Sequence, residues 1–215
     1  GIIWIGTREG FNRLDSRTGK IQRFYLQERG QGTPISNEVI ALIKQPFTKN
    51  IWIGTPDGLF LVDQASGRIR HYDDTQVNSL FMDKKGNLWA GTEYKGIYRL
   101  NPGTGELKRF PRMMEIMPAI TIRSIFQAPS GVIWFGADYG GLFRYDPGNG
   151  ASPPKWSHYI YDHRNPRALH SRSVLCIYRD RGGIFWFGGR SGIDKWDPRT
   201  RAFGNFYHLP NNPNS

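Results

Sequence analysis

The chain has 215 residues, a formal net charge of +11 and 38% hydrophobic residues, which is enough to bury a core in one large domain or in a repeat array. No apolar run reaches the roughly 18 residues that a membrane-spanning helix requires. The sequence begins with Gly1-Ile2-Ile3-Trp4, inside a strand-like pattern. We therefore expect a segment of a longer protein, and the lack of a visible signal peptide is uninformative.

The basic excess has two interpretations. The chain carries 29 Lys and Arg residues against 18 Asp and Glu. Such a balance can mark a nucleic-acid-binding surface. Here the basic residues are scattered and their densest groups are short, as at Lys84-Lys85. This distribution favours basic side chains that solvate the outer strands and turns of a sheet protein, so we expect no nucleic-acid partner.

The chain has one cysteine, Cys176, so no disulfide framework indicates its compartment. Cys176 lies in the apolar run Ser173-Val174-Leu175-Cys176-Ile177-Tyr178. We expect a buried, inert thiol at this position.

A short motif built around tryptophan recurs five times. Its clearest copy is Ile133-Trp134-Phe135-Gly136, followed by a polar tip and a second apolar strand. Successive copies are separated by 48, 37, 45 and 52 residues, a spacing typical of a solenoid or a propeller in a β-rich chain. The repeated tryptophans are Trp4, Trp52, Trp89, Trp134 and Trp186. We expect the last four to be largely buried, each packing on a neighbouring sheet.

Each copy predicts the same hairpin-rich unit. Short alternating strands are bounded by Gly, Pro, Asn and Asp, the pattern of antiparallel hairpins. The glycine that opens the third strand lies 6 residues after the tryptophan in three copies and 7 residues after it in the other two. The additional residue falls in the loop between the second and third strands, so only a loop tip grows. A glycine two residues after each tryptophan predicts close approach of neighbouring sheets.

The pattern predicts an all-β β-propeller with about five four-stranded antiparallel blades, the first of which is incomplete. We treat residues 1–215 as a single propeller segment. A ring of seven blades of about 45 residues each would need roughly 315 residues. We therefore expect an open arc or part of a larger, seven-bladed propeller. The expected repeats are 1–34, 35–76, 77–118, 119–170 and 171–215.

The recurring residues resemble a known repeat family. Asp180-Arg181-Gly182-Gly183-Ile184-Phe185-Trp186-Phe187-Gly188-Gly189 shows the pattern most fully. With the turn Asp15-Ser16-Arg17-Thr18-Gly19 and the openings Ser36-Asn37-Glu38-Val39 and Ser171-Arg172-Ser173-Val174, it resembles the two-component regulator propeller repeat. Four positions depart from the pattern and weaken individual turns: Pro46, Lys49, Ala128 and Arg201.

The resemblance implies the extracytoplasmic sensor region of a bacterial hybrid two-component histidine kinase. It implies a periplasmic location, with the membrane anchor and the kinase domain outside this chain. It is also compatible with a homodimer of the parent protein. Members of the family sense glycan breakdown products, so the resemblance implies an oligosaccharide as the ligand. The repeat itself does not encode the ligand.

No constellation of residues predicts catalysis, a metal or a cofactor. The chain has no phosphate-binding loop, dinucleotide fingerprint or metalloprotease motif. His158, His163 and His170 fall in one region, but their spacings do not ensure convergent metal ligands. We expect the aspartates in the repeated turns to cap their own backbone.

Strand direction predicts where a ligand would bind. In a four-stranded antiparallel unit, the loop between strands two and three opens on the same face as the link between units. Tyr94 and Tyr139 occupy the one-residue extensions of two such loops, and a tyrosine offers an apolar ring and a hydroxyl that suit a sugar. The candidate ligand-binding residues at these tips are Tyr94, Lys95, Asp138, Tyr139, Arg190, Arg8 and Asp57.

The leading functional hypothesis is a non-catalytic module that senses a small polar ligand for a membrane signalling receptor. One alternative is a propeller enzyme that resembles the streptogramin lyases, which would need His and Glu residues and a metal converging on one face. The other alternative is a basic nucleic-acid-binding domain, whose binding would weaken steeply with salt.

Overall fold

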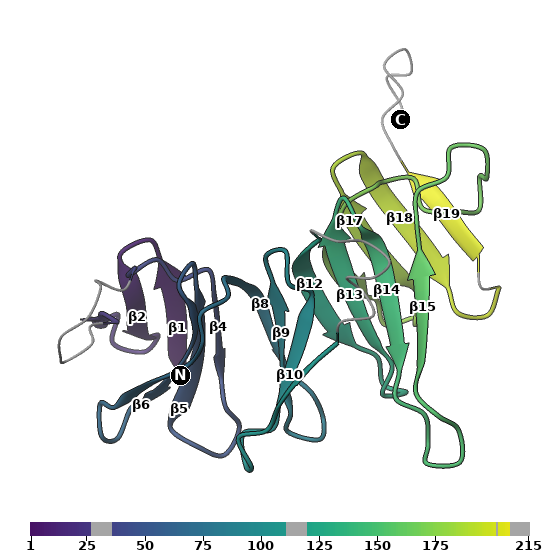
Figure 1. The fold of residues 1–215 in the computed structure, drawn as a ribbon. Helices are drawn as coiled ribbons and strands as arrows, with labels where there is room; N and C mark the ends of the chain where they lie inside the picture. The colour runs from purple at the N-terminus through teal and green to yellow at the C-terminus, as the bar shows by residue number, and fades with distance from the viewer. Residues whose placement is uncertain (27–35, 111–119, 201, 207–215) are drawn as a thin grey trace. The chain divides into compact units, whose positions relative to one another are not determined.

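The computed structural model describes residues 1–26, 36–110, 120–200 and 202–206. Its regular elements in these ranges are β-strands, which form five antiparallel sheets of consecutive strands (Figure 1). None of the described segments is an apolar helix long enough to traverse a lipid bilayer. The predicted all-β fold with one sheet per repeat is confirmed.

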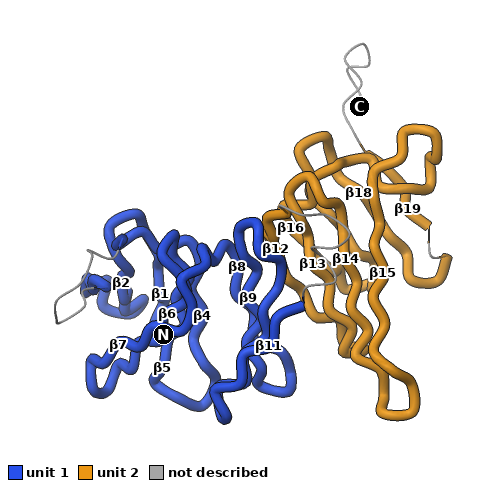
Figure 2. The backbone as a smooth tube through the Cα atoms, in the orientation of Figure 1, with its two compact units in different colours: residues 1–110 blue, residues 111–215 orange. Residues whose placement is uncertain are grey.

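The chain divides into two compact units, residues 1–110 and 111–215 (Figure 2). The first unit contains three sheets. The first sheet has three strands, which confirms the incomplete first repeat, and each of the next two has four. The strands are β1 (Ile2–Thr7), β2 (Gly10–Asp15) and β3 (Ile21–Phe24); β4 (Ala41–Lys44), β5 (Asn50–Thr55), β6 (Gly58–Asp63) and β7 (Ile69–Asp73); and β8 (Val77–Met82), β9 (Leu88–Thr92), β10 (Ile97–Leu100) and β11 (Leu107–Arg109).

The second unit contains two four-stranded sheets, here called the fourth and fifth sheets of the chain. In each sheet the strands follow one another in sequence order, so every connection within it is a hairpin. The strands are β12 (Thr121–Gln127), β13 (Ile133–Asp138), β14 (Gly141–Asp146) and β15 (Lys155–Tyr159); and β16 (Val174–Arg179), β17 (Phe185–Gly189), β18 (Gly192–Asp197) and β19 (Ala202–Phe206).

The core of the second unit lies between the fourth and fifth sheets and is centred on Trp134. This side chain is 1% exposed and belongs to a cluster of buried residues drawn from both sheets. Its ring centroid lies 5.4 Å from that of Phe185, 5.6 Å from that of Phe187 and 5.0 Å from that of Trp196. The tryptophan of one repeat therefore packs on the sheet of the next.

The same arrangement recurs in the first unit. Trp52 on β5 is fully buried in a cluster with Leu88 and Tyr98 of the third sheet. Trp4 on β1 is partly buried and packs against a buried cluster that includes Ile51 and Phe60 of the second sheet. Trp89 is 1% exposed, as predicted.

Trp186 corrects the prediction that all four later tryptophans are largely buried. It is half-buried, and its indole Nε1 donates to Asp180 Oδ2 at 2.9 Å. Trp4, Trp52 and Trp134 pack on the following sheet of their own unit, whereas the described residues provide no sheet after the fifth.

Cys176 is a second correction, because its side chain is exposed. It lies on β16 opposite Gly188 of β17. At the corresponding position of the fourth sheet, Ser124 lies opposite Gly136, where Val174 of the next sheet approaches closely. The apolar run alone therefore does not predict that Cys176 is buried, because burial here requires a neighbouring sheet as well as an apolar strand.

The glycine two residues after each repeat tryptophan can allow a neighbouring sheet to approach closely. A Cβ atom at Gly54 would lie 2.6 Å from Cγ1 of Val77, and one at Gly136 would lie 2.8 Å from Cγ1 of Val174. Both valines begin the first strand of the following sheet. The predicted close approach of neighbouring sheets is confirmed at Gly54 and Gly136, whereas a Cβ atom at Gly188 would meet only Sγ of Cys176 in its own sheet.

The repeated turns between the third and fourth strands are capped as predicted. Asp63 Oδ1 accepts a hydrogen bond from the backbone N–H of Ala65 at 2.8 Å, and Gly67 has a φ of 69°. Asp15 and Asp197 accept the equivalent bonds from Arg17 and Arg199, each at 2.9 Å. These aspartates stabilise turns, because the carboxylate replaces the partners that the turn backbone lacks.

Candidate functional site

The loops between the second and third strands lie beside the links that join successive repeats, as predicted. In the second unit, the N–H of Gly141 donates to the carbonyl oxygen of Arg172 at 2.9 Å. In the first unit, the N–H of Gly10 donates to the carbonyl oxygen of Asn37 at 2.7 Å. The expected long links between repeats are 26–37, 111–120 and 161–172; the first two lie largely outside the described residues.

Asp138 and Arg190 join the tips of the fourth and fifth sheets. Arg190 Nε donates to Asp138 Oδ1 at 3.2 Å, and Arg190 Nη2 donates to Asp138 Oδ2 at 2.9 Å. Ser173 Oγ donates to Asp138 Oδ1 at 2.7 Å, and Arg123 Nη2 lies 3.6 Å from Oδ2. Asp138 is 8% exposed, so its carboxylate acts mainly on these neighbours and holds the Arg190 guanidinium at the surface.

The charge state of this cluster follows from its contacts. The hydrogen bond from Arg190 lowers the pKa of Asp138, burial acts in the opposite direction, and the bond from Ser173 lowers the pKa further. The same carboxylate raises the pKa of Arg190. Asp138 therefore stays ionised at neutral pH, and the pair persists as an ion pair.

Tyr139 is held outward by its backbone. It is 67% exposed and has a φ of 57°, in the left-handed region that a non-glycine residue enters at a cost of roughly 1–2 kcal/mol. Its N–H donates to Ser173 Oγ at 3.0 Å, and the Arg190 guanidinium carbon lies 5.7 Å from the centroid of its ring. Tyr139 therefore presents a fixed aromatic surface beside a fixed cation.

Two hollows flank Tyr139 and share Tyr161 and Arg172 in their walls. The first has a volume of about 380 Å³ and is completed by His170, Arg190 and three serines. The second has a volume of about 490 Å³ and is completed by His158, Ile160 and the glycines of the tip. Arg172 lies over the Tyr161 ring, 5.5 Å from its centroid. We call Tyr139, Tyr161, His170, Arg172 and Arg190 the tip site.

Two side chains beneath the tip site fix its shape. His158 stacks on Phe143 at a centroid distance of 4.0 Å, and its Nε2 donates to the carbonyl oxygen of Gly140 at 2.8 Å. The carboxylate of Asp194, which is 1% exposed, accepts a hydrogen bond from the N–H of His170 at 2.9 Å. His158 holds the tip and Asp194 holds the link, so both walls of the tip site are supported by residues of the sheets.

The buried carboxylate of Asp194 predicts a pH dependence of stability. Burial raises its pKa, and Oδ2 has no hydrogen-bond partner among the described residues. Because the folded-state pKa is raised, its contribution to stability is present below the unfolded pKa of about 4 and is lost as the pH rises through the folded value. We expect the free energy of unfolding of Asp194→Asn, relative to that of the parent, to increase as the pH rises from 3 to 8. Urea unfolding at each pH measures this difference. A constant difference would contradict this assignment.

The first unit places the remaining candidates at the tips of its own sheets. Tyr94 is 57% exposed and has a φ of 61°, so it matches Tyr139 in conformation. Lys95 Nζ donates to Thr75 Oγ1 at 3.2 Å. Arg8 and Asp57 are exposed, and Asp57 Oδ2 accepts a hydrogen bond from the backbone of Ser36.

The sequence did not identify the residues of the link as part of the site. Tyr161, His170 and Arg172 line the hollows, and Ser173 bonds to both Asp138 and Tyr139. The signal in the sequence is the opening Ser171-Arg172-Ser173-Val174, which by itself indicates only a repeat boundary. Among the described residues, no group of three or more His, Cys, Asp or Glu side chains could hold a metal ion.

The fold is similar to that of extracellular domains of putative two component systems. Residues 71–94 match the family model described as "Two component regulator propeller". The extracellular domain of the putative hybrid two component system BT4673 from B. thetaiotaomicron has a TM-score of 0.72 and 24% identity over 97% of this chain and 26% of its own. The extracellular domain of the putative hybrid two component system BT3049 from the same organism has a TM-score of 0.74 and 23% identity over 96% and 29% of the two chains.

A third similar structure has another context. PorZ, described as a bacterial surface component of the type-IX secretion system of Porphyromonas gingivalis, has a TM-score of 0.71 and 16% identity, over 91% of this chain and 30% of its own. The present chain thus spans between 26% and 30% of the length of these three structures. A comparison with curated proteins finds no match.

Proposed function

Because the chain carries the two-component regulator propeller repeat, we propose that it is a non-catalytic, ligand-sensing segment of a bacterial membrane signalling receptor. The observation that carries this proposal is the tip site, where exposed Tyr139 is held beside Arg190 and between two hollows. Loops supported by a rigid sheet scaffold are a common place for binding.

The chemistry of the tip site suits a small polar ligand, for which we propose an oligosaccharide. The rings of Tyr139 and Tyr161 can contact the CH face of a sugar, and their hydroxyls can bond its oxygens. Arg172 and Arg190 add donors that point outward, since Asp138 holds Arg190 from below. In this proposal Asp138 positions Arg190 and does not itself contact the ligand.

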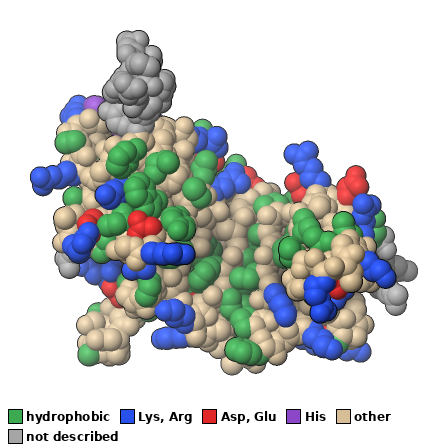
Figure 3. Space-filling model, turned by 180° about the vertical axis from the view of Figure 1, so that it is seen from behind, with side chains coloured by type: hydrophobic (Ala, Val, Ile, Leu, Met, Phe, Trp, Pro, Cys, Tyr) green, Lys and Arg blue, Asp and Glu red, His purple; other side chains and the backbone are tan. Residues whose placement is uncertain are grey.

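The similar extracellular domains support the proposed cellular setting. Their descriptions as extracellular domains of putative hybrid two component systems support an extracytoplasmic location, and we propose the periplasm. We further propose that a histidine kinase, a membrane anchor and a larger, seven-bladed propeller lie outside this segment, and that the parent protein forms a homodimer. Lys and Arg side chains are dispersed over the surface visible in Figure 3. This supports the interpretation that they solvate the sheets and does not favour a nucleic-acid-binding surface.

The test removes the side chain of Tyr139 and keeps the backbone conformation of the tip. We expect Tyr139→Gly to abolish binding of the best ligand in an oligosaccharide panel, measured by calorimetry, while thermal stability stays the same or rises. Glycine adopts a φ of 57° without the cost that tyrosine incurs. Arg190→Gln should weaken binding by at least about tenfold, the equivalent of one lost charged hydrogen bond of about 1.5–3 kcal/mol.

Tyr178→Ala is the matched control, because Tyr178 is 62% exposed on β16 and lies outside the tip site. Its binding should equal that of the parent. Unchanged binding in Tyr139→Gly would remove the tip site from the proposal, and the equivalent Tyr94→Gly variant then tests the first unit.

A further inference from the structure

The fourth repeat lacks a hydrogen bond that three other repeats make. The indole Nε1 of Trp89 donates to Asp83 Oδ2 at 2.8 Å, and that of Trp186 donates to Asp180 Oδ2 at 2.9 Å. In the second repeat, Trp52 donates to Gln45 Oε1 at 3.2 Å. The fourth repeat has Ala128 at this position, and Trp134 Nε1 has no acceptor among the described residues.

The missing carboxylate is not needed to form the turn. The N–H of Ala128 donates to the carbonyl oxygen of Val132 at 2.8 Å, and the N–H of Gly131 donates to that of Ala128 at 2.9 Å. The turn that begins at Asp83 makes the same two backbone bonds, each at 2.9 Å. The Ala128 turn therefore keeps its backbone geometry and lacks only the side-chain acceptor.

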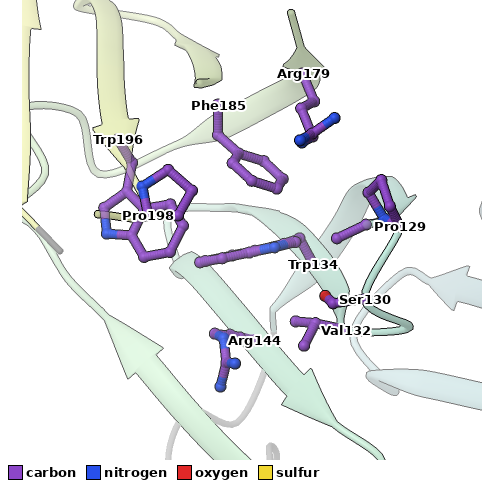
Figure 4. Close-up of a pocket in the computed structure, with 10 residues that line it drawn as sticks. Pro129, Ser130, Val132, Trp134, Arg144, Arg179, Phe185, Trp196 and Pro198 are labelled. Atoms are coloured by element: carbon purple, nitrogen blue, oxygen red, sulfur yellow. The ribbon is translucent and has the colours of Figure 1, made fainter. Parts of the chain in front are cut away.

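A pocket of about 450 Å³ lies where that acceptor would be. Figure 4 shows Trp134 at its centre, with Phe185 and Arg179 on one side, Arg144 on the other, and Pro129 at one end. The pocket lies at the start of β13, whereas Tyr139 follows the end of that strand. It is therefore separate from the tip site, and its volume is within the range of small-molecule sites, roughly 300–1,000 Å³.

The lining combines apolar rings with an available cation. Arg144 is paired with Asp146 at 3.0 Å. Arg179 has no acidic partner among the described residues, and its guanidinium carbon lies 5.9 Å from the centroid of Phe185. A half-buried guanidinium beside an unpartnered indole N–H is a favourable environment for a carboxylate.

We propose that this pocket, the Ala128 pocket, binds a small aromatic carboxylate. The ligand's carboxylate takes the place of the missing aspartate side chain, where it accepts from Trp134 Nε1 and pairs with Arg179. Its ring lies against Trp134 and Phe185, because aromatic rings prefer offset or edge contacts with one another. This site is additional to the proposed oligosaccharide site and does not depend on it.

The test titrates the chain with phenylacetate and with its neutral analogue phenylacetamide, and follows the indole N–H signals by NMR. Phenylacetate should shift the Trp134 signal and bind at least about tenfold more tightly than the amide. Arg179→Gln should remove that preference, since the cation that distinguishes acid from amide is lost. Equal affinity for the two compounds, or a shift confined to other tryptophans, would overturn the proposal.

The decisive variant restores the repeat pattern. Ala128→Asp places a carboxylate beside Trp134 and Arg179, so binding of phenylacetate should fall at least about tenfold while thermal stability stays the same or rises. Ala151→Asp adds the same charge at an exposed turn outside the pocket and should bind as the parent does. If Ala128→Asp binds phenylacetate with unchanged affinity, the site is refuted; Arg179→Gln decides the question should that variant fail to fold.

Discussion

Trp134→Ala should lower the free energy of unfolding of the second unit by about 3–5 kcal/mol, the usual cost of truncating a buried large aromatic side chain. Trp134 is 1% exposed, and its ring contacts aromatic side chains from both sheets of that unit. Removing it leaves a cavity between two sheets that cannot collapse, because each is fixed by its own ladder of hydrogen bonds. Urea unfolding followed by far-ultraviolet circular dichroism measures the loss without relying on tryptophan fluorescence.

Trp186→Ala is the matched control for that experiment. Trp186 occupies the same position in its repeat but is half-buried, so truncation removes less apolar surface from contact. It should cost clearly less than Trp134→Ala, although the bond to Asp180 is also lost. Equal losses in the two variants would show that packing on the following sheet is not what stabilises the repeat.

The periodic features of the fold could be predicted from the sequence because the repeat encodes them locally. Alternation defines the strands, glycine and aspartate define the turns, and the tryptophan marks the buried face. Burial at the fifth sheet could not be predicted in this way. Trp186 and Cys176 carry the same local pattern as buried residues elsewhere, and their exposure depends on which sheet lies beside them.

The candidate site was predictable only in part, for a related reason. Tyr139 and Asp138 were identified as tip residues, but the bond from Arg190 to Asp138 joins positions 52 residues apart. The link residue Ser173 bonds to Tyr139 and Asp138 of the fourth-sheet tip across 34 and 35 residues. No local spacing specifies which tips of neighbouring repeats meet, since that depends on how one sheet packs on the next.

The Ala128 pocket shows a different limit. The departure from the repeat pattern at Ala128 is visible in the sequence, where it predicts a weaker turn. The backbone bonds of that turn are nevertheless kept, and the effect lies at Trp134, six residues further along the chain. A substitution within a repeat thus has to be judged by the partner its side chain has in the other copies.

Gly54→Ala should destabilise the first unit by about 1–3 kcal/mol, the usual cost of overpacking a filled core. A Cβ atom at this position would lie 2.6 Å from Cγ1 and 2.9 Å from the carbonyl oxygen of Val77. Rotating the valine side chain does not relieve the second contact, because the oxygen belongs to the backbone. The second and third sheets must therefore separate slightly, which weakens the contacts that bury Trp52 between them.

Two companion variants make this prediction specific to sheet spacing. Gly188→Ala changes the same repeat position in the fifth sheet, where the added Cβ meets only Sγ of Cys176, an exposed side chain that can rotate away. It should cost much less than Gly54→Ala. Val77→Ala added to Gly54→Ala should recover little stability, because the backbone contact persists and a buried valine is lost. Urea midpoints of the three variants measure these differences, and a neutral Gly54→Ala would show that the sheets are not held at this distance by the glycine.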